Sequence, residues 1–326
     1  MLKKFAVRLW GKLPRFVRKA LRGVFLALPK GLQMRLARPS YWRFGLLVSD
    51  YYRRHPLLAR PYREELKILR RLYRRDPNDP ALYEDSPMLV FPYAFCGAYR
   101  AMDIPVLRGE NGLPYVTHQG KRLYFPASWS EDALRAWYRS LCVEQDPESP
   151  HRYLTPELQD ARFEVFIDAG SAEGLLALEM ADRVERVVLI ECDPLWLPAL
   201  RATFAPWKDK VTIIEKKLSD TDSEDSVTLN TLAREMKIKN ALLKMDIEGF
   251  EARAIAGAGA LGEYASAVLC CAYHRAGDAR ELPAALARLG YRCGFSRGYM
   301  LFAHPPAWLP KPEPPYFRKG LIRALK

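Results

Sequence analysis

The sequence predicts a doubly wound α/β fold of Rossmann type, and two observations carry this prediction. First, the run FEVFIDAGSAEG, residues 163–174, is an apolar strand pattern that reaches an acid and two glycines and then opens a helix over residues 175–180. Second, three further apolar runs follow at intervals typical of β-α units, within RVVLIECD, VTIIEKKLSD and LLKMDIEGFE. Because ligands bind beyond the carboxyl ends of strands in such sheets, we expect the functional site there.

The length and composition suit one such domain with extensions. With 326 residues, 49% of them hydrophobic, the chain can bury a full core. We expect a main domain of roughly 150 to 180 residues. The predicted divisions are a basic helical N-terminal arm (1–75), a small α+β accessory region (76–153), the Rossmann-like domain (154–304) and a proline-rich C-terminal tail across the surface (305–326).

The basic charge is concentrated in the N-terminal arm. Residues 1–75 carry 21 Lys and Arg against 3 Asp and Glu, whereas the whole chain has a net charge of +13. Apolar residues recur at helical spacing over residues 2–28, with a kink expected at Pro14, which predicts a basic amphipathic helix. Such a helix suits an anionic membrane surface, the partner we favour for residues 1–28, but packing on the main domain and binding of nucleic acid remain alternatives, nucleic acid the least favoured.

The cysteines and the hydropathy bear on the compartment. The six cysteines form no C-x-x-C pair, and several lie in apolar runs, which favours reduced core thiols. No apolar stretch approaches the 18 or so residues of a membrane-spanning helix, and no secretory signal pattern is visible. We therefore expect a cytoplasmic protein, peripheral at the inner face of the membrane if the arm binds lipid.

The accessory region has two recognisable elements. Two strand patterns flank residues 118–120 and predict a hairpin, and Ser128 with Glu131 forms a capping-box pattern that predicts a helix through Leu141. The aromatic residues of this region fill its core or stack on a sugar, and core filling is favoured.

The first strand-to-helix turn has the spacing D-x-G-x-x-x-G, with Asp168, Gly170 and Gly174. Glycine serves where the backbone approaches a ligand closely or takes positive φ. A carboxylate at Asp168 would repel a pyrophosphate but suits the ammonium of S-adenosylmethionine. Glu191 ends the second strand and can accept both ribose hydroxyls, as the acid of dinucleotide sites also does. Together these residues favour S-adenosylmethionine as the cofactor.

The fourth predicted strand, residues 240–245, ends in a dense polar segment. Lys244, Asp246, Glu248, Gly249 and Glu251 fall within eight residues, which packing alone explains poorly. Lys244 either points toward the site or pairs with Glu248 and Glu251, and pairing is the favoured reading.

This segment matches K-x-D-x-E-G-x-E, and on it the chain resembles the FkbM family of S-adenosylmethionine-dependent methyltransferases. The resemblance spans about residues 160–303 and includes the glycine turn, Glu191 and a strand ending at Tyr273 and His274. It implies a class I methyltransferase fold. Departures are Asn230 where a T-L-D triplet is usual and E-C-D-P after the second strand. The residues assigned to the cofactor are Asp168, Gly170, Ser171, Gly174, Glu191, Ser219, Asp220 and Asp246.

The resemblance implies methyl transfer to oxygen, with a hydroxyl of a glycan, a lipid-linked saccharide or a secondary metabolite as the small-molecule acceptor. Such a displacement requires an aligned acceptor and a base. The candidate catalytic residues are His274, Asp246 and Glu248, although a histidine that ends an apolar strand is as often structural. The same carboxylates could bind a divalent metal, a reading we do not favour.

Two other functions compete with this one. An RNA methyltransferase would use the basic arm to neutralise phosphates. A binding protein that has lost activity would keep the fold, but the complete set of site residues argues against it.

Overall fold

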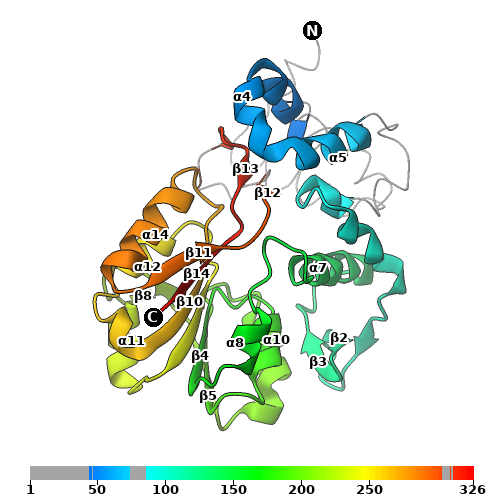
Figure 1. Cartoon of the computed structure of the whole chain (residues 1–326). Coiled ribbons are helices and arrows are strands. Elements are labelled where there is room, and N and C mark those ends of the chain that lie inside the picture. The colour runs from blue at the N-terminus through cyan, green and yellow to red at the C-terminus, as the bar shows by residue number, and fades with distance from the viewer. Residues whose placement is uncertain (1–43, 46, 74–85, 303–308, 310) are drawn as a thin grey trace, which may run out of the picture.

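The computed structural model describes residues 44–45, 47–73, 86–302, 309 and 311–326. A seven-stranded sheet forms the centre of the molecule (Figure 1), and within it only β14 runs antiparallel to its neighbours. In spatial order the strands are β11 (Arg292–Phe295), β14 (Leu321–Leu325), β10 (Ala265–Cys271), β9 (Ala241–Met245), β4 (Val165–Ala169), β5 (Arg186–Ile190) and β6 (Val211–Ile214).

The strand order defines the fold. Numbered along the chain, the seven strands lie in the order 6-7-5-4-1-2-3, with the antiparallel seventh strand between the fifth and the sixth. This is the Rossmann-like arrangement of class I methyltransferases, so the predicted fold class is confirmed. The order reverses between β4 and β9, and a doubly wound sheet binds its ligand outside the carboxyl ends of the strands at that switch point.

Alternating residues of each strand face two separate hydrophobic cores. In β4, Phe166 packs on one side with the helices that follow the first strand, while Val165 and Ile167 pack on the other side. Side chains of a strand alternate between its two faces, and both faces of β4 are buried, which explains why all of its residues except Asp168 are apolar. The helices of the first layer are α7 (Glu131–Glu144), α9 (Leu175–Met180) and α10 (Leu197–Phe204), and those of the second are α11 (Leu229–Glu235), α12 (Glu251–Ala256), α13 (Leu261–Tyr264) and α14 (Asp278–Arg288).

The elements predicted around the first glycine turn are confirmed. The apolar run from Phe163 forms β4, and the helix over residues 175–180 has the bounds that the sequence predicts. The second, third and fourth predicted strands are β5, β6 and β9. Two short strands after β6 in the chain, β7 (Lys217–Leu218) and β8 (Ser226–Val227), pair with each other, and α8 (Pro156–Asp160) precedes β4.

The prediction of a surface tail after residue 304 is wrong for its last residues. Leu321–Leu325 form β14, which hydrogen bonds to β10 on one side and to β11 on the other. Leu321, Ile322 and Ala324 are fully buried. The strand joins the sheet because both of its neighbours present free ladder groups to it, a long-range requirement that leaves no mark in the proline-rich segment before it.

The accessory region contains the predicted hairpin, formed by β2 (Pro114–His118) and β3 (Lys121–Tyr124), with β1 (Leu107–Arg108) beside it. The helix after it is α7, but its cap is Ser130 and not the predicted Ser128. The Ser130 hydroxyl accepts the Ala133 amide at 3.3 Å. Phe125 is fully buried in the core, so core filling is confirmed for this aromatic residue.

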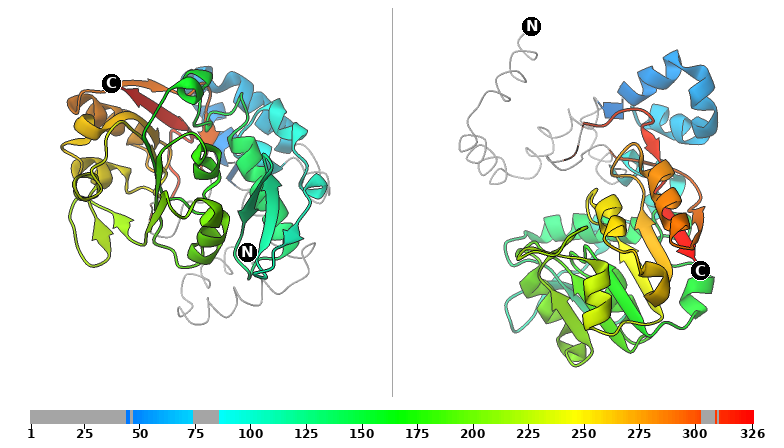
Figure 2. Two further views of the ribbon diagram at one scale, coloured as in Figure 1. Left: turned by 90° about the horizontal axis from the view of Figure 1, so that it is seen from below. Right: turned by 90° about the vertical axis from the view of Figure 1, so that its left-hand side faces the viewer.

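The N-terminal helices lie at one end of the molecule, beside the short strands β12 (Met300–Leu301) and β13 (Phe317–Arg318) (Figures 1 and 2). They include helical residues 47–54, α4 (Pro56–Ala59) and α5 (Arg63–Tyr73). The predicted amphipathic helix over residues 2–28 lies outside the described residues. Among the described helices, none has both the length and the apolar character that a crossing of the bilayer requires.

Candidate active site

The glycine turn after β4 is pressed against the end of β9. Gly170 has φ +74°, and a Cβ atom on it would lie 1.9 Å from the backbone oxygen of Asp246. Gly174, with φ +78°, caps α9, and a Cβ atom there would lie 2.8 Å from the ring of Phe204. The buried Ser171 hydroxyl donates to the Asp168 carbonyl at 2.7 Å and closes the turn. Glycine is therefore required at both positions by conformation and by space.

Beneath this turn lies a buried ion pair. Lys244 Nζ is 2.8 Å from Asp168 Oδ1, and their side chains are 8% and 2% exposed. The two residues are register partners in β4 and β9 and face the same side of the sheet. Lys244 Nζ also donates to the Gly170 carbonyl at 2.6 Å, so it ties the turn to the neighbouring strand.

This pairing corrects the expectation for Lys244. Its partner is Asp168, and not Glu248 or Glu251, because the register of β9 against β4 places Lys244 opposite Asp168. The position also bears on Asp168, whose carboxylate is covered and neutralised by the ammonium in this conformation. Burial raises the pKa of Asp168, and the charge of Lys244 opposes that rise.

Glu191 follows β5 and hydrogen bonds to the glycine turn. One carboxylate oxygen accepts the Ala172 amide at 2.9 Å and the other accepts the Asp193 amide at 2.7 Å. Each oxygen keeps a second lone pair, so the side chain can still accept hydroxyl groups of a ligand.

The two candidates after the third strand follow β7. Ser219 donates to Asp220, and Asp220 forms an ion pair at 2.8 Å with Arg253 of α12, the helix that follows the K-x-D-x-E-G-x-E segment. This ion pair places Asp220 beside the helix in which that segment ends.

Asp246, directly after β9, is the centre of a polar network. Its two oxygens accept hydrogen bonds from Tyr153 at 2.9 Å and from Tyr273 at 3.1 Å. The Nε2 atoms of His274 and His151 lie 3.4 and 3.8 Å from the same carboxylate. Burial by itself would raise the pKa of Asp246, but His274, Lys244 and His151 and the tyrosine hydrogen bond hold it well below its usual range.

The two histidines beside Asp246 have opposite pKa shifts. Burial lowers the pKa of His151 to about 4, so this imidazole is neutral at physiological pH. Burial also acts to lower the pKa of His274, but the hydrogen bond and charge of Glu251, with Asp246 and Glu248, raise it to about 9. Its Nδ1 atom is 3.0 Å from Glu251, whose side chain is 1% exposed. His274 is therefore an imidazolium at neutral pH and has no lone pair with which to accept a proton.

Glu248 stands at the open edge of this network. Its side chain is 54% exposed and lies 3.6 Å from His274 Nε2. The residue has φ +55°, and Gly249 after it has φ +89°. Burial raises the pKa of Glu248, and the charge of His274 opposes that rise. Two successive left-handed residues turn the backbone sharply and place the carboxylate of Glu248 beside the histidine.

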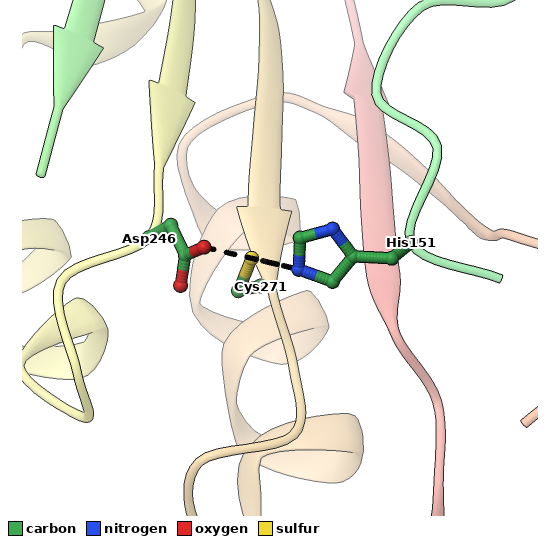
Figure 3. Close-up of side chains that lie close together, drawn as sticks. All are labelled: His151, Asp246 and Cys271. Carbon is green, nitrogen blue, oxygen red and sulfur yellow. Dashed lines mark hydrogen bonds and ion pairs between the residues drawn. The ribbon is translucent and has the colours of Figure 1, made fainter. Parts of the chain in front are cut away.

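No sequence pattern marks His151 and Tyr153 as site residues. Both lie in the segment before α8, far along the chain from Asp246, and only the fold brings them to it. Figure 3 shows His151 pointing toward Asp246, and Cys271 of β10 lies next to both side chains. The thiol is 3.6 Å from His151 Nε2.

Two groups of side chains have the spacing of metal ligands, namely His151, Asp246 and Cys271, and Asp246, Glu251 and His274. Either set would have to release a proton on binding a divalent cation, because burial raises the pKa of the Cys271 thiol well above its ordinary value and the carboxylates around His274 raise its pKa to about 9. The cofactor S-adenosylmethionine would be held by the glycine turn and by Glu191, whose oxygens keep lone pairs for ribose hydroxyls.

Comparison with known proteins adds little beyond the fold. No protein-family model matches the chain. No curated protein matches it either. Among solved structures, it is similar to precorrin-6y C5,15-methyltransferase from Geobacter metallireducens (13% identity, 52% of this chain and 84% of that one, TM-score 0.34). It is also similar to magnesium protoporphyrin IX methyltransferase from Synechocystis with bound SAM (13%, 52% and 73%, 0.32) and to the 23S rRNA methyltransferase ErmE (17%, 52% and 64%, 0.33).

The names of these three proteins indicate different acceptors. The assignment of this chain to the class I methyltransferase fold rests on its strand order.

Proposed function

We propose that this protein is an S-adenosylmethionine-dependent O-methyltransferase of FkbM type that acts on a hydroxyl of a glycan, a lipid-linked saccharide or a secondary metabolite. The observation that carries the proposal is the position of Asp246. Its backbone oxygen touches Gly170 of the glycine turn, while its carboxylate is the centre of the tyrosine and histidine network. The candidate cofactor turn and the candidate acid-base group are thus in direct contact.

The residues that would hold the cofactor are those of the turn and Glu191. Gly170 and Gly174 keep the turn free of side chains, Lys244 fixes it from below, and Glu191 offers oxygen lone pairs for ribose hydroxyls. The cofactor supplies an electrophilic methyl group when it is bound. The FkbM assignment and the hydroxyl acceptor come from the K-x-D-x-E-G-x-E resemblance.

The protein's own residues then have separate roles. Asp246, held ionised, orients the acceptor hydroxyl and favours a positive centre beside it. Glu248 is the best general base, because it is the exposed carboxylate of the network and its pKa is raised. His274, as an imidazolium, stabilises these carboxylates instead of taking the proton, which changes the base role that its sequence position suggests.

Calorimetry with S-adenosylmethionine tests the cofactor site. Glu191→Gln should weaken binding by roughly 10- to 100-fold, because the amide has only one oxygen that can accept hydrogen bonds and carries no charge. The matched control is Glu185→Gln, an exposed acid before the opposite end of the same strand, which should bind as the wild type does. Equal affinity for all three proteins would remove the cofactor assignment.

The acceptor is tested by transfer of a radiolabelled methyl group to extracted glycans, lipids and RNA in parallel. The proposal expects label in a glycan, lipid or small-molecule fraction, and loss of that label with Glu248→Gln. Label in RNA alone would establish the competing RNA methyltransferase function. Binding of the cofactor with no transfer to any fraction would support an inactive binding protein.

A further inference from the structure

We propose that residues 53–63, at the tip of the N-terminal helices, form a docking surface for an anionic lipid membrane. This tip includes the turn α4 and reads Arg-Arg-His-Pro-Leu-Leu-Ala-Arg-Pro-Tyr-Arg. It is distinct from the amphipathic pattern over residues 2–28 and does not depend on the proposed methyl transfer.

The tip exposes large apolar side chains where the fold could have buried them. Leu57 is 70% exposed and Leu58 is 54% exposed. α4 has no buried residue at all. Two adjacent exposed leucines in a short turn are costly in water, which is the usual mark of a surface that contacts something apolar.

The helices on either side of the tip hold it firmly. Val48 and Tyr52 before it and Leu66 and Leu69 after it are buried, and they pack with Phe317 of β13. These four side chains therefore belong to a core that faces the body of the protein, whereas Leu47 of the same helices is 48% exposed. The leucines of α4 take no part in that core and lie at its outer end, where Figure 1 shows α4 far from the sheet.

The charge around the leucines indicates the kind of partner. Within residues 53–63 there are four arginines and no acid. Arg53 and Arg54 precede the leucines, and Arg60 and Arg63 follow them, and all four are exposed. Asp50 pairs with Arg53 at 2.7 Å and with Arg54 at 2.5 Å, which leaves a positive excess.

Apolar side chains ringed by cations match the interface of an anionic bilayer, where the leucines enter the acyl boundary and the guanidinium groups meet the phosphates. A nucleic acid would use the arginines but would leave two aliphatic side chains in water. A bilayer uses both features, which is why we commit to lipid.

The test is cosedimentation of the full chain with vesicles of phosphatidylcholine, with and without phosphatidylglycerol. Leu57→Ser/Leu58→Ser should lower the partition coefficient on anionic vesicles by roughly 10- to 50-fold, from the apolar area that remains exposed in the free protein. Arg60→Gln/Arg63→Gln should lower it by roughly 30-fold on anionic vesicles and leave the weak binding to neutral vesicles unchanged.

The matched control is Leu107→Ser, which changes a leucine of similar exposure, 46%, in the accessory hairpin region. It should bind vesicles as the wild type does, and thermal melting should show that all variants fold. Wild-type partition by Leu57→Ser/Leu58→Ser would overturn the proposal. So would RNA binding without vesicle binding, or a dimer in light scattering that these serines dissociate, since either would give the tip another partner.

Discussion

Replacement of Lys244 by methionine is expected to be among the most damaging single changes in the protein. The substitution keeps an unbranched side chain of nearly the same length but removes the ammonium from a pair whose members are 8% and 2% exposed. Asp168 would then be a buried carboxylate without its cation, and the Gly170 carbonyl would lose a 2.6 Å hydrogen bond. Breaking a buried pair in this way costs about 3 to 5 kcal/mol, and the lost bond to the carbonyl adds about 1 kcal/mol.

The double variant Lys244→Met/Asp168→Asn separates the charge from the packing. With both charges removed, no buried ion remains, so we expect it to recover at least about 2 kcal/mol relative to the single lysine variant. Lys244→Met alone should also gain stability toward acid pH, because protonation of Asp168 removes the unpaired charge.

The measurement is the free energy of unfolding in urea, followed by tryptophan fluorescence. Lys239→Met is the matched control, since Lys239 is an exposed lysine just before the same strand and should change stability by less than about 0.5 kcal/mol. A loss below about 1 kcal/mol for Lys244→Met, or simple additivity in the double variant, would refute the reasoning from burial.

Three further predictions follow from the same site. In urea unfolding, Gly170→Ala should destabilise the protein well beyond the control Gly112→Ala. Both positions have similar positive φ, so the control should cost about 1 to 2 kcal/mol, but only at Gly170 would the Cβ atom collide with Asp246. Equal losses of stability for the two variants would contradict the steric argument. Because the pKa of His274 is raised to about 9, its protonation contributes about 3 kcal/mol of stability below about pH 6.5, and this contribution is lost as the pH rises through about 9. The difference in free energy of unfolding between the wild type and His274→Gln should therefore shrink between these pH values. A difference that stays constant would count against a protonated histidine. Tyr153→Phe should reduce the rate of methyl transfer by roughly 10-fold, because the Tyr153 hydroxyl donates a hydrogen bond to Asp246, while S-adenosylmethionine binding in calorimetry stays unchanged. An unchanged rate would remove Tyr153 from the site.

The parts of the fold that the sequence predicts are those with local causes. The β4 strand is apolar apart from Asp168, and the glycine after it must adopt positive φ, so both are visible within a dozen residues. Helix α9 follows directly, with the bounds expected. The K-x-D-x-E-G-x-E segment likewise indicates a site at the end of β9, because its polar residues are adjacent in the chain.

Long-range pairing set the limits of this prediction. The place of β14 between β11 and β10 depends on pairing with two strands earlier in the chain, and the prolines before it suggest only a tail. His151 and Tyr153 reach Asp246 across the sheet, so no spacing rule could associate them with it. The partner of Lys244 was missed for the same reason, since register between β4 and β9 decides it.

The protonation of the histidines shows why residue type alone could not assign the base. His274 and His151 both lie beside the Asp246 carboxylate, yet the pKa of His274 is raised to about 9 and that of His151 is lowered to about 4. The difference comes from Glu251, which is buried against Nδ1 of His274, whereas burial dominates at His151. An imidazolium fixed between carboxylates serves as a counter-ion, and a neutral imidazole with a pKa of about 4 is a weak base. We therefore propose Glu248 as the general base of the methyl transfer, because its carboxylate is exposed and its pKa is raised.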